Sequence, residues 1–111
     1  MAQGMNTALI DAVAEQFKAL AEPARLRLLN RLMESEANVN ELAAAAGMSQ
    51  ANASKHLAQL AQAGLVVRSK VGTNAIYSLG DERLRELCDL MCERALQRAQ
   101  SSLAAMKRRA R

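Results

Sequence analysis

The chain has 111 residues and is 50% hydrophobic, with a single Phe, a single Tyr and no Trp, so it can bury one modest core of aliphatic side chains. No apolar run approaches the ~18 residues of a membrane span. The N-terminus lacks the basic start of a secretory signal. Two cysteines without such a signal fit a reducing cytoplasm. The formal net charge of +4 comes from the last five residues, 107–111, which carry four positive charges and leave 11 basic against 11 acidic residues in 1–106.

Hydrophobic side chains recur at helical spacing over residues 6–20, which predicts a first helix. Glu22 and Pro23 interrupt this pattern. Pro23 is suited to the first position of a second helix, because its fixed φ already matches the helix. The apolar side of that second helix consists of Leu26, Leu29, Leu32 and Met33.

Two further helices follow, separated by a short corner that contains glycine. Asn38, followed three residues later by Glu41, predicts a capping box at the start of a helix over 39–46. Ser49 is a favourable N-cap for a helix over 50–63. Glycine is common just past a helix end, and both helices are followed by one, Gly47 and Gly64. A pair of helices joined by such a tight turn is typical of a helix-turn-helix.

Two β-rich runs, 65–70 and 75–79, flank the turn residues Gly72, Thr73 and Asn74 and predict a hairpin. Asp81 is the expected cap of a last helix that continues to about residue 106. The fold is therefore expected to be mainly α-helical with a small β-hairpin, a winged helix-turn-helix in which four helices precede two strands and a long helix. We expect residues 1–106 to form a single domain and residues 107–111 to be a flexible basic tail.

The helix over 50–63 has two different faces. At about 100° per residue, one side gathers the residues expected to face the core, Ala53, Leu57, Leu60 and Ala61. The opposite side has neither apolar bulk nor a carboxylate, and carries Asn52, Lys55, Gln59 and Gln62, flanked by Ser54 and His56. Asn and Gln make paired hydrogen bonds to adenine edges, and Lys reaches guanine or phosphate, so this face is suited to reading DNA. The alternative is an ordinary solvated helix face.

A second feature points to a polyanionic partner, because residues 42–80 contain no Asp or Glu. A surface without carboxylates does not repel phosphates. The hairpin adds cations and small polar groups suited to phosphate or minor-groove contact. The residues expected to bind DNA are Ser49, Gln50, Asn52, Ser54, Lys55, His56, Gln59, Gln62, Arg68, Lys70, Thr73 and Asn74.

Over roughly residues 15–80 the sequence resembles the ArsR/SmtB family of winged-helix repressors. The resemblance is carried by ALAEPARLRLL at 19–29, VNELA at 39–43, MSQANASKHL at 48–57 and LAQAGLV at 60–66, followed by Gly72 and the run 77–79. The most specific elements are Ser-Lys-His-Leu at 54–57 and Ala-Gly-Leu-Val at 63–66.

The resemblance implies a homodimer, paired through the first and last helices, that represses a promoter until an effector binds. Its operator in double-stranded DNA would be an imperfect inverted repeat that places two recognition helices about one DNA turn apart. The effector sites of the family do not carry over. Residues 38–42 lack the Cys-x-Cys pair of its arsenic and cadmium sensors, and the only histidine, His56, lies outside the last helix that its zinc sensors use.

Cys88 and Cys92 are four residues apart and share one face of the last helix. Their Cβ atoms would lie about 6 Å apart, too far for an intrahelical disulfide without distortion. With a further donor, the two thiolates could bind a thiophilic metal or metalloid ion such as As(III), Cu(I) or Cd(II). They could instead sense oxidation, or simply pack at the dimer interface with no bound ion, because Cys behaves as a small buried hydrophobe.

An enzyme is not expected, because the sequence has no convergent acid–base set, no glycine-rich phosphate loop and no nucleophile near a base. One alternative is a winged-helix module for protein or RNA contact, which predicts an exposed apolar or aromatic patch or an acidic recognition face. Another is an ArsR-type regulator without cysteine-dependent sensing. The sequence favours a cytoplasmic, homodimeric DNA-binding repressor with no membrane partner, and leaves the effector, the operator sequence and the regulated genes open.

Overall fold

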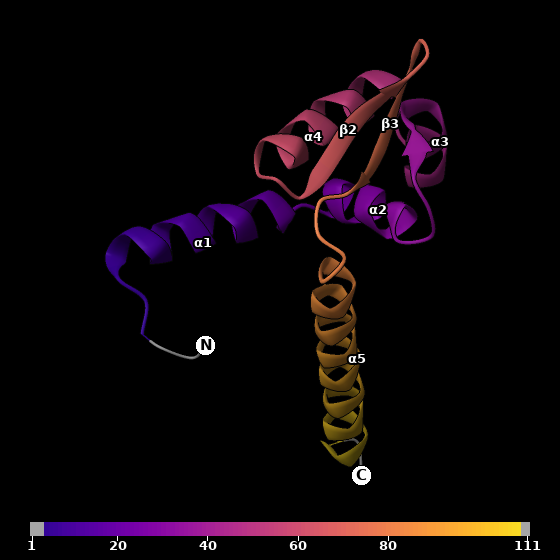
Figure 1. Ribbon diagram of the computed structural model, residues 1–111. Coiled ribbons are helices and arrows are strands. Elements are labelled where there is room, and N and C mark those ends of the chain that lie inside the picture. The colour runs from indigo at the N-terminus through magenta and orange to yellow at the C-terminus, as the bar shows by residue number, and fades with distance from the viewer. Residues whose placement is uncertain (1–3, 110–111) are drawn as a thin grey trace. The chain divides into compact units, whose positions relative to one another are not determined.

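The computed structural model describes residues 4–109, which form five helices and a three-stranded antiparallel sheet (Figure 1). The helices are α1 (Thr7–Leu20), α2 (Pro23–Leu32), α3 (Val39–Ala46), α4 (Gln50–Gln62) and α5 (Leu84–Arg109). The strands are β1 (Ala37–Asn38), β2 (Val66–Val71) and β3 (Asn74–Leu79). The elements up to Asp81 form one compact unit, and the residues from Glu82 onward form a second.

The helix starts expected at α3 and α4 are confirmed by their capping hydrogen bonds. The backbone amide of Glu41 donates to Asn38 Oδ1 at 2.9 Å, and the amide of Asn38 donates to Glu41 Oε1 at 3.0 Å. At α4, the amide of Asn52 donates to Ser49 Oγ at 3.1 Å. Each bond satisfies an amide that the helix itself leaves unpaired, so the caps fix where both helices begin.

The hydrophobic core of the first unit lies between α2, α3, α4 and the sheet. The predicted core face of α4 is confirmed at Ala53, Leu57 and Leu60, which have no exposed surface, whereas Ala61 is only partly buried. The other large, fully buried side chains are Leu28, Leu29, Leu32 and Leu42. Packing of these leucines fixes which side of α4 faces inward, and the opposite side is left exposed.

The predicted hairpin is confirmed, with Val66 opposite Leu79 and Val71 opposite Asn74. The sheet also contains a strand that the sequence pattern did not predict. Strand β1 pairs antiparallel with β3, with Ala37 opposite Tyr77, which gives the strand order β1-β3-β2. The segment between α2 and α3 is thereby attached to the hairpin.

The start expected for the last helix was wrong. Helix α5 begins at Leu84 rather than directly after Asp81, because Glu82 and Arg83 form a turn in which the amide of Arg85 donates to the Glu82 carbonyl at 3.2 Å. The helix also continues to Arg109, so residues 107–109 of the expected basic tail are helical, and 110–111 lie outside the described residues. Between residues 4 and 109, no helix is both long and apolar enough to cross a membrane.

The two ends of the hairpin are tied together at the end of α4. Gly64 has φ +77°, a conformation that favours glycine, and its neighbour Leu65 donates its amide to the Leu60 carbonyl at 2.9 Å. The amide of Gly80 in turn donates to the Leu65 carbonyl at 2.9 Å. A Cβ placed on Gly80 would lie 2.2 Å from the Gly64 carbonyl oxygen. The chain can therefore leave the hairpin along this path only with glycine at position 80.

Replacement of this glycine tests the hairpin closure. We expect Gly80→Ala to lower the free energy of unfolding by about 1–3 kcal/mol, because the methyl group would overlap backbone that cannot rotate away. Gly4→Ala is the matched control, since a Cβ at Gly4 meets nothing within 4 Å. Chemical denaturation of both variants measures the difference, and equal stabilities would contradict the close approach.

Candidate nucleic-acid interface

The exposed side of α4 carries most of the residues expected to bind DNA. Asn52 and Lys55 are exposed near the start of the helix and Gln62 near its end. The remaining exposed residues of the expected set are Ser49, Gln50, Ser54, Gln59, Arg68, Lys70, Thr73 and Asn74. His56 differs from the others, because only 19% of its side chain is exposed.

The hairpin contributes a second group of polar and basic side chains. Arg68 and Lys70 are two residues apart on β2 and therefore lie on the same face of the strand. Their partners across the strand pair are Tyr77 and Ala75. Gly72, with φ +66°, makes the tight turn that brings Thr73 to the tip. The basic side chains are thus on the strand, and the small polar groups are at the turn.

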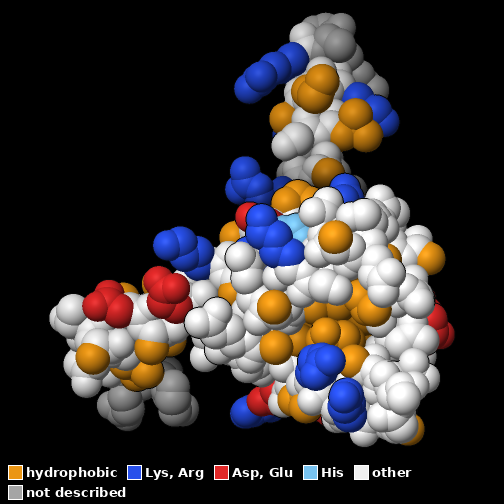
Figure 2. Space-filling view, turned by 90° about the horizontal axis from the view of Figure 1, so that it is seen from above, with side chains coloured by type: hydrophobic (Ala, Val, Ile, Leu, Met, Phe, Trp, Pro, Cys, Tyr) orange, Lys and Arg blue, Asp and Glu red, His pale blue; other side chains and the backbone are white. Residues whose placement is uncertain are grey.

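The surface around α4 and the hairpin contains few acidic groups. Figure 2 shows Lys and Arg over this surface beside uncharged polar and hydrophobic side chains, with few Asp and Glu among them. The cause is in the sequence, since residues 42–80 contain no carboxylate side chain. A polyanion could approach this face without repulsion from acidic side chains.

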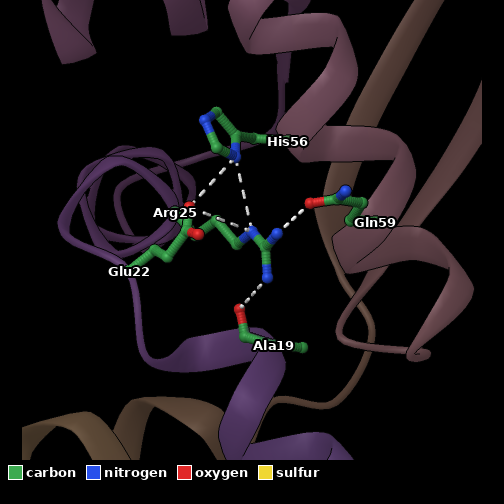
Figure 3. Close-up of polar contacts among 5 residues, drawn as sticks. All are labelled: Ala19, Glu22, Arg25, His56 and Gln59. Carbon is green, nitrogen blue, oxygen red and sulfur yellow. Dashed lines mark hydrogen bonds and ion pairs between the residues drawn. The ribbon is translucent and has the colours of Figure 1, made fainter.

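A partly buried arginine forms the polar junction behind this face. The guanidinium of Arg25, at the start of α2, lies between α1 and α4 (Figure 3). Its Nη1 donates to the Ala19 carbonyl at 3.2 Å, its Nε donates to His56 Nδ1 at 3.3 Å, and its Nη2 donates to Gln59 Oε1. Only 13% of the Arg25 side chain is exposed. One side chain therefore joins three helices.

Glu22, the residue before α2, adds a carboxylate to the same junction. Its Oε2 lies 3.8 Å from Arg25 Nε and 3.6 Å from His56 Nδ1. Sequence reasoning did not assign Glu22 or Arg25 to this site. His56 and Gln59 are 31 and 34 residues from Arg25 along the chain, so no local spacing indicated the contact.

The two cysteines lie on the uninterrupted helix α5 and are both free. Cys92 is exposed and Cys88 is partly buried. Burial raises the pKa of the Cys88 thiol, and the neighbouring Cys92 and Asp89 raise it further through negative charge. Among residues 4–109, no cluster of three or more His, Cys, Asp or Glu side chains is placed to hold a metal ion. Within one chain, the candidate donors for a soft ion are therefore these two thiols.

The comparison with known sequences identifies a family of regulators. Residues 22–67 match the bacterial regulatory proteins of the arsR family. NmtR, a transcriptional regulator of Mycobacterium tuberculosis, is 40% identical over 77 residues, which are 69% of this chain and 64% of NmtR. A protein of Streptomyces lividans named as a probable mercury resistance operon repressor is 39% identical over 77 residues, 69% of this chain and 62% of that protein. The chain thus spans less than two thirds of the length of these relatives.

Solved structures share the fold. The winged helix-turn-helix DNA-binding domain of Mb0332 from Mycobacterium bovis, described as homodimeric, superposes with a TM-score of 0.75 at 35% identity and covers 88% of this chain and 95% of that one. Rv0081 of M. tuberculosis gives the same TM-score and identity and covers 87% and 97%. The winged helix-turn-helix expected from the sequence is therefore confirmed, and the matching proteins are transcriptional regulators rather than enzymes.

The raised pKa of Cys88 predicts how this thiol reacts. Iodoacetamide attacks the thiolate, so a pKa above the ordinary value moves the rise in alkylation rate to higher pH. In a Cys92→Ser background, we expect Asp89→Asn to raise the alkylation rate of Cys88 at pH 8 about twofold, because one negative charge is removed. Mass spectrometry of timed samples gives the rates, with Glu93→Gln as the control. An unchanged rate in Asp89→Asn would contradict the charge effect.

Proposed function

This chain belongs to the arsR family of bacterial regulatory proteins, and we propose that it is a homodimeric repressor that binds double-stranded DNA through α4 and the β2–β3 hairpin. The observation that carries the proposal is the composition of the exposed face of α4. Asn52, Lys55 and Gln62 are exposed there, opposite the fully buried Leu57 and Leu60. Amide and ammonium groups on a face without carboxylates suit both base edges and phosphates.

The start of α4 favours contact with DNA as well. The helix has no acidic residue in its first turn, so the partial positive charge of its N-terminus is not neutralised by a side chain. Phosphate oxygens would accept hydrogen bonds at this end of the helix. Arg68 and Lys70 on β2 would add contacts to the DNA phosphate backbone beside the bases that α4 contacts. The proposed repressor acts on DNA in the cytoplasm.

The dimer is proposed to form through α1 and α5, with a second copy of the chain as partner. Helix α1 exposes Leu9, Ile10 and Phe17, each with about half of its surface accessible. Helix α5 exposes Leu96, Leu103 and Met106, which together with Ala99 follow the a/d spacing of a coiled-coil seam. Such stripes of exposed apolar side chains are typical of helices that pack against another subunit. A two-fold dimer would read an imperfect inverted repeat.

Release from DNA is proposed to depend on Cys88 and Cys92. They are a pair of soft ligands on one helix face, and the S. lividans relative is named for mercury resistance. Two thiolates are an incomplete set for a tetrahedral ion, so further donors would come from the second subunit. Because the ligands must lose their protons, ion binding would weaken as the pH falls. Thiol oxidation is the alternative signal for the same pair.

The DNA-binding proposal is tested with promoter-proximal DNA in a salt series. We expect a specific complex whose affinity falls steeply with salt. Lys55→Ala should weaken binding to all sequences and reduce the salt slope by about 1, whereas Asn52→Ala should relax the preference at one base position by about 1–3 kcal/mol.

Fluorescence anisotropy measures these affinities, with Arg27→Ala on α2 as the control cation. No preference for any promoter DNA over scrambled DNA would overturn the proposal. If the chain binds RNA or another protein instead of DNA, the winged helix would be assigned to that partner.

The effector proposal is tested with the same assay. We expect arsenite, Cd(II), Cu(I), Hg(II) or peroxide to release wild-type protein from DNA. Cys88→Ser and Cys92→Ser should each raise the concentration required at least about tenfold, because one of two ligands is lost. Both variants should bind DNA like wild type without effector. If both variants are released from DNA at the same effector concentration as wild type, Cys88 and Cys92 have only a packing role and the effector binds at another site.

A further inference from the structure

The Arg25 junction divides the polar side chains of α4 into two groups. His56 and Gln59 contact the guanidinium of Arg25, as Figure 3 shows, whereas Asn52 and Lys55 are exposed in the N-terminal half of the helix. All four were expected from the sequence to face DNA. We propose that Arg25 is a positioning residue that holds α4 through His56 and Gln59, so that these two side chains anchor the helix, Asn52 reads a base and Lys55 contacts phosphate. This inference rests on the proposed DNA-binding function.

The chemistry of Gln59 supports its role as an anchor. A glutamine that reads adenine uses its carbonyl oxygen and its amide nitrogen together, one as acceptor and the other as donor. In this structure Gln59 Oε1 already accepts a hydrogen bond from Arg25 Nη2. Because that hydrogen bond fixes the direction of the Gln59 amide, a paired contact to a base would require the base to approach in that direction or the side chain to turn away from Arg25.

Turning Gln59 away would remove one acceptor from Arg25. Only 13% of the Arg25 side chain is exposed, although its contact with Gln59 lies at the exposed edge of the junction. A guanidinium also presents its donors in a rigid planar fork, so the Ala19 carbonyl, His56 and Gln59 are held in fixed directions from one another. The end of α1 and the middle of α4 thus keep a fixed spacing.

The His56 contact also depends on protonation. Nδ1 of a neutral imidazole can accept a hydrogen bond from Arg25 Nε, but a protonated Nδ1 has no lone pair and can only donate. Its alternative partner is Glu22 Oε2, 3.6 Å away. The other charged groups near the junction are Glu15 and Lys18 of α1, which line a groove of about 500 Å³ together with Glu22, Arg25 and Gln59.

The first experiment compares base preferences. The affinities of wild type, Asn52→Ala, Gln59→Ala, Arg25→Ala, Arg25→Lys and the Arg25→Ala/Gln59→Ala double variant are measured against operators substituted at each position. We expect Gln59→Ala and Arg25→Ala to weaken every operator about tenfold without changing the order of preference, and the double variant to bind within about twofold of Arg25→Ala alone. Arg25→Lys should restore part of the affinity. Arg27→Ala, on the exposed side of the same helix, is the matched control.

Loss of preference at a single base pair in Gln59→Ala, with full affinity in Arg25→Ala, would assign Gln59 to base reading and overturn the proposal. Additive losses in the double variant would also overturn it, because they would show two independent roles.

The second experiment needs no DNA, so it separates failure of this inference from failure of the proposed function. NMR of the free protein should show the Arg25 Nε–H protected from solvent exchange at pH 7.5, and less protected at the same pH in His56→Ala. The Arg27 Nε–H should exchange rapidly in every case. Exchange of Arg25 as fast as that of Arg27 at pH 7.5 would overturn the junction, whether or not the chain binds DNA.

Discussion

The packing of the first unit depends on one charged side chain placed where three helices meet. Arg25 is nearly buried, and its hydrogen bonds reach the last residues of α1 and the middle of α4. Leucines fix the inner face of α4, but apolar contacts have no direction and would tolerate some rotation of the helix. Directional hydrogen bonds to a planar group remove that freedom. The exposed side of α4 therefore has a defined orientation before any ligand arrives.

The sequence alone was sufficient to predict the features that depend on residues close together in the chain. The capping box of Asn38 and Glu41 and the cap at Ser49 each involve residues three apart, and the structure contains all of these hydrogen bonds. The buried face of α4 follows from the period of the helix, and Leu57 and Leu60 lie in the core as expected. The hairpin followed from the turn chemistry at Gly72. Family resemblance and helical periodicity led to the same fold.

Features that depend on distant parts of the chain could not be predicted in this way. Strand β1 has two residues, too few for an alternating pattern, and it exists because Tyr77 and its neighbour on β3 offer a free edge. The contacts of Arg25 with His56 and Gln59 cross more than 30 residues. From the sequence alone, all the polar side chains on this face of α4 were expected to be available for contact with DNA. The start of α5 was misjudged because an acidic residue that precedes a helix pattern need not be adjacent to the first helical residue.

The closure of the hairpin at Gly64 and Gly80 has an evolutionary consequence. The hydrogen bond between Gly80 and Leu65 holds the start of β2 and the end of β3 together. The positions of these two ends therefore do not depend on how many residues lie between them. Extending such a loop costs only about 0.6 kcal/mol for each doubling of its length. Insertions or deletions at the tip, around Gly72 and Thr73, can therefore accumulate without disturbing α4. The length of the β2–β3 hairpin can therefore change while α4 keeps its place.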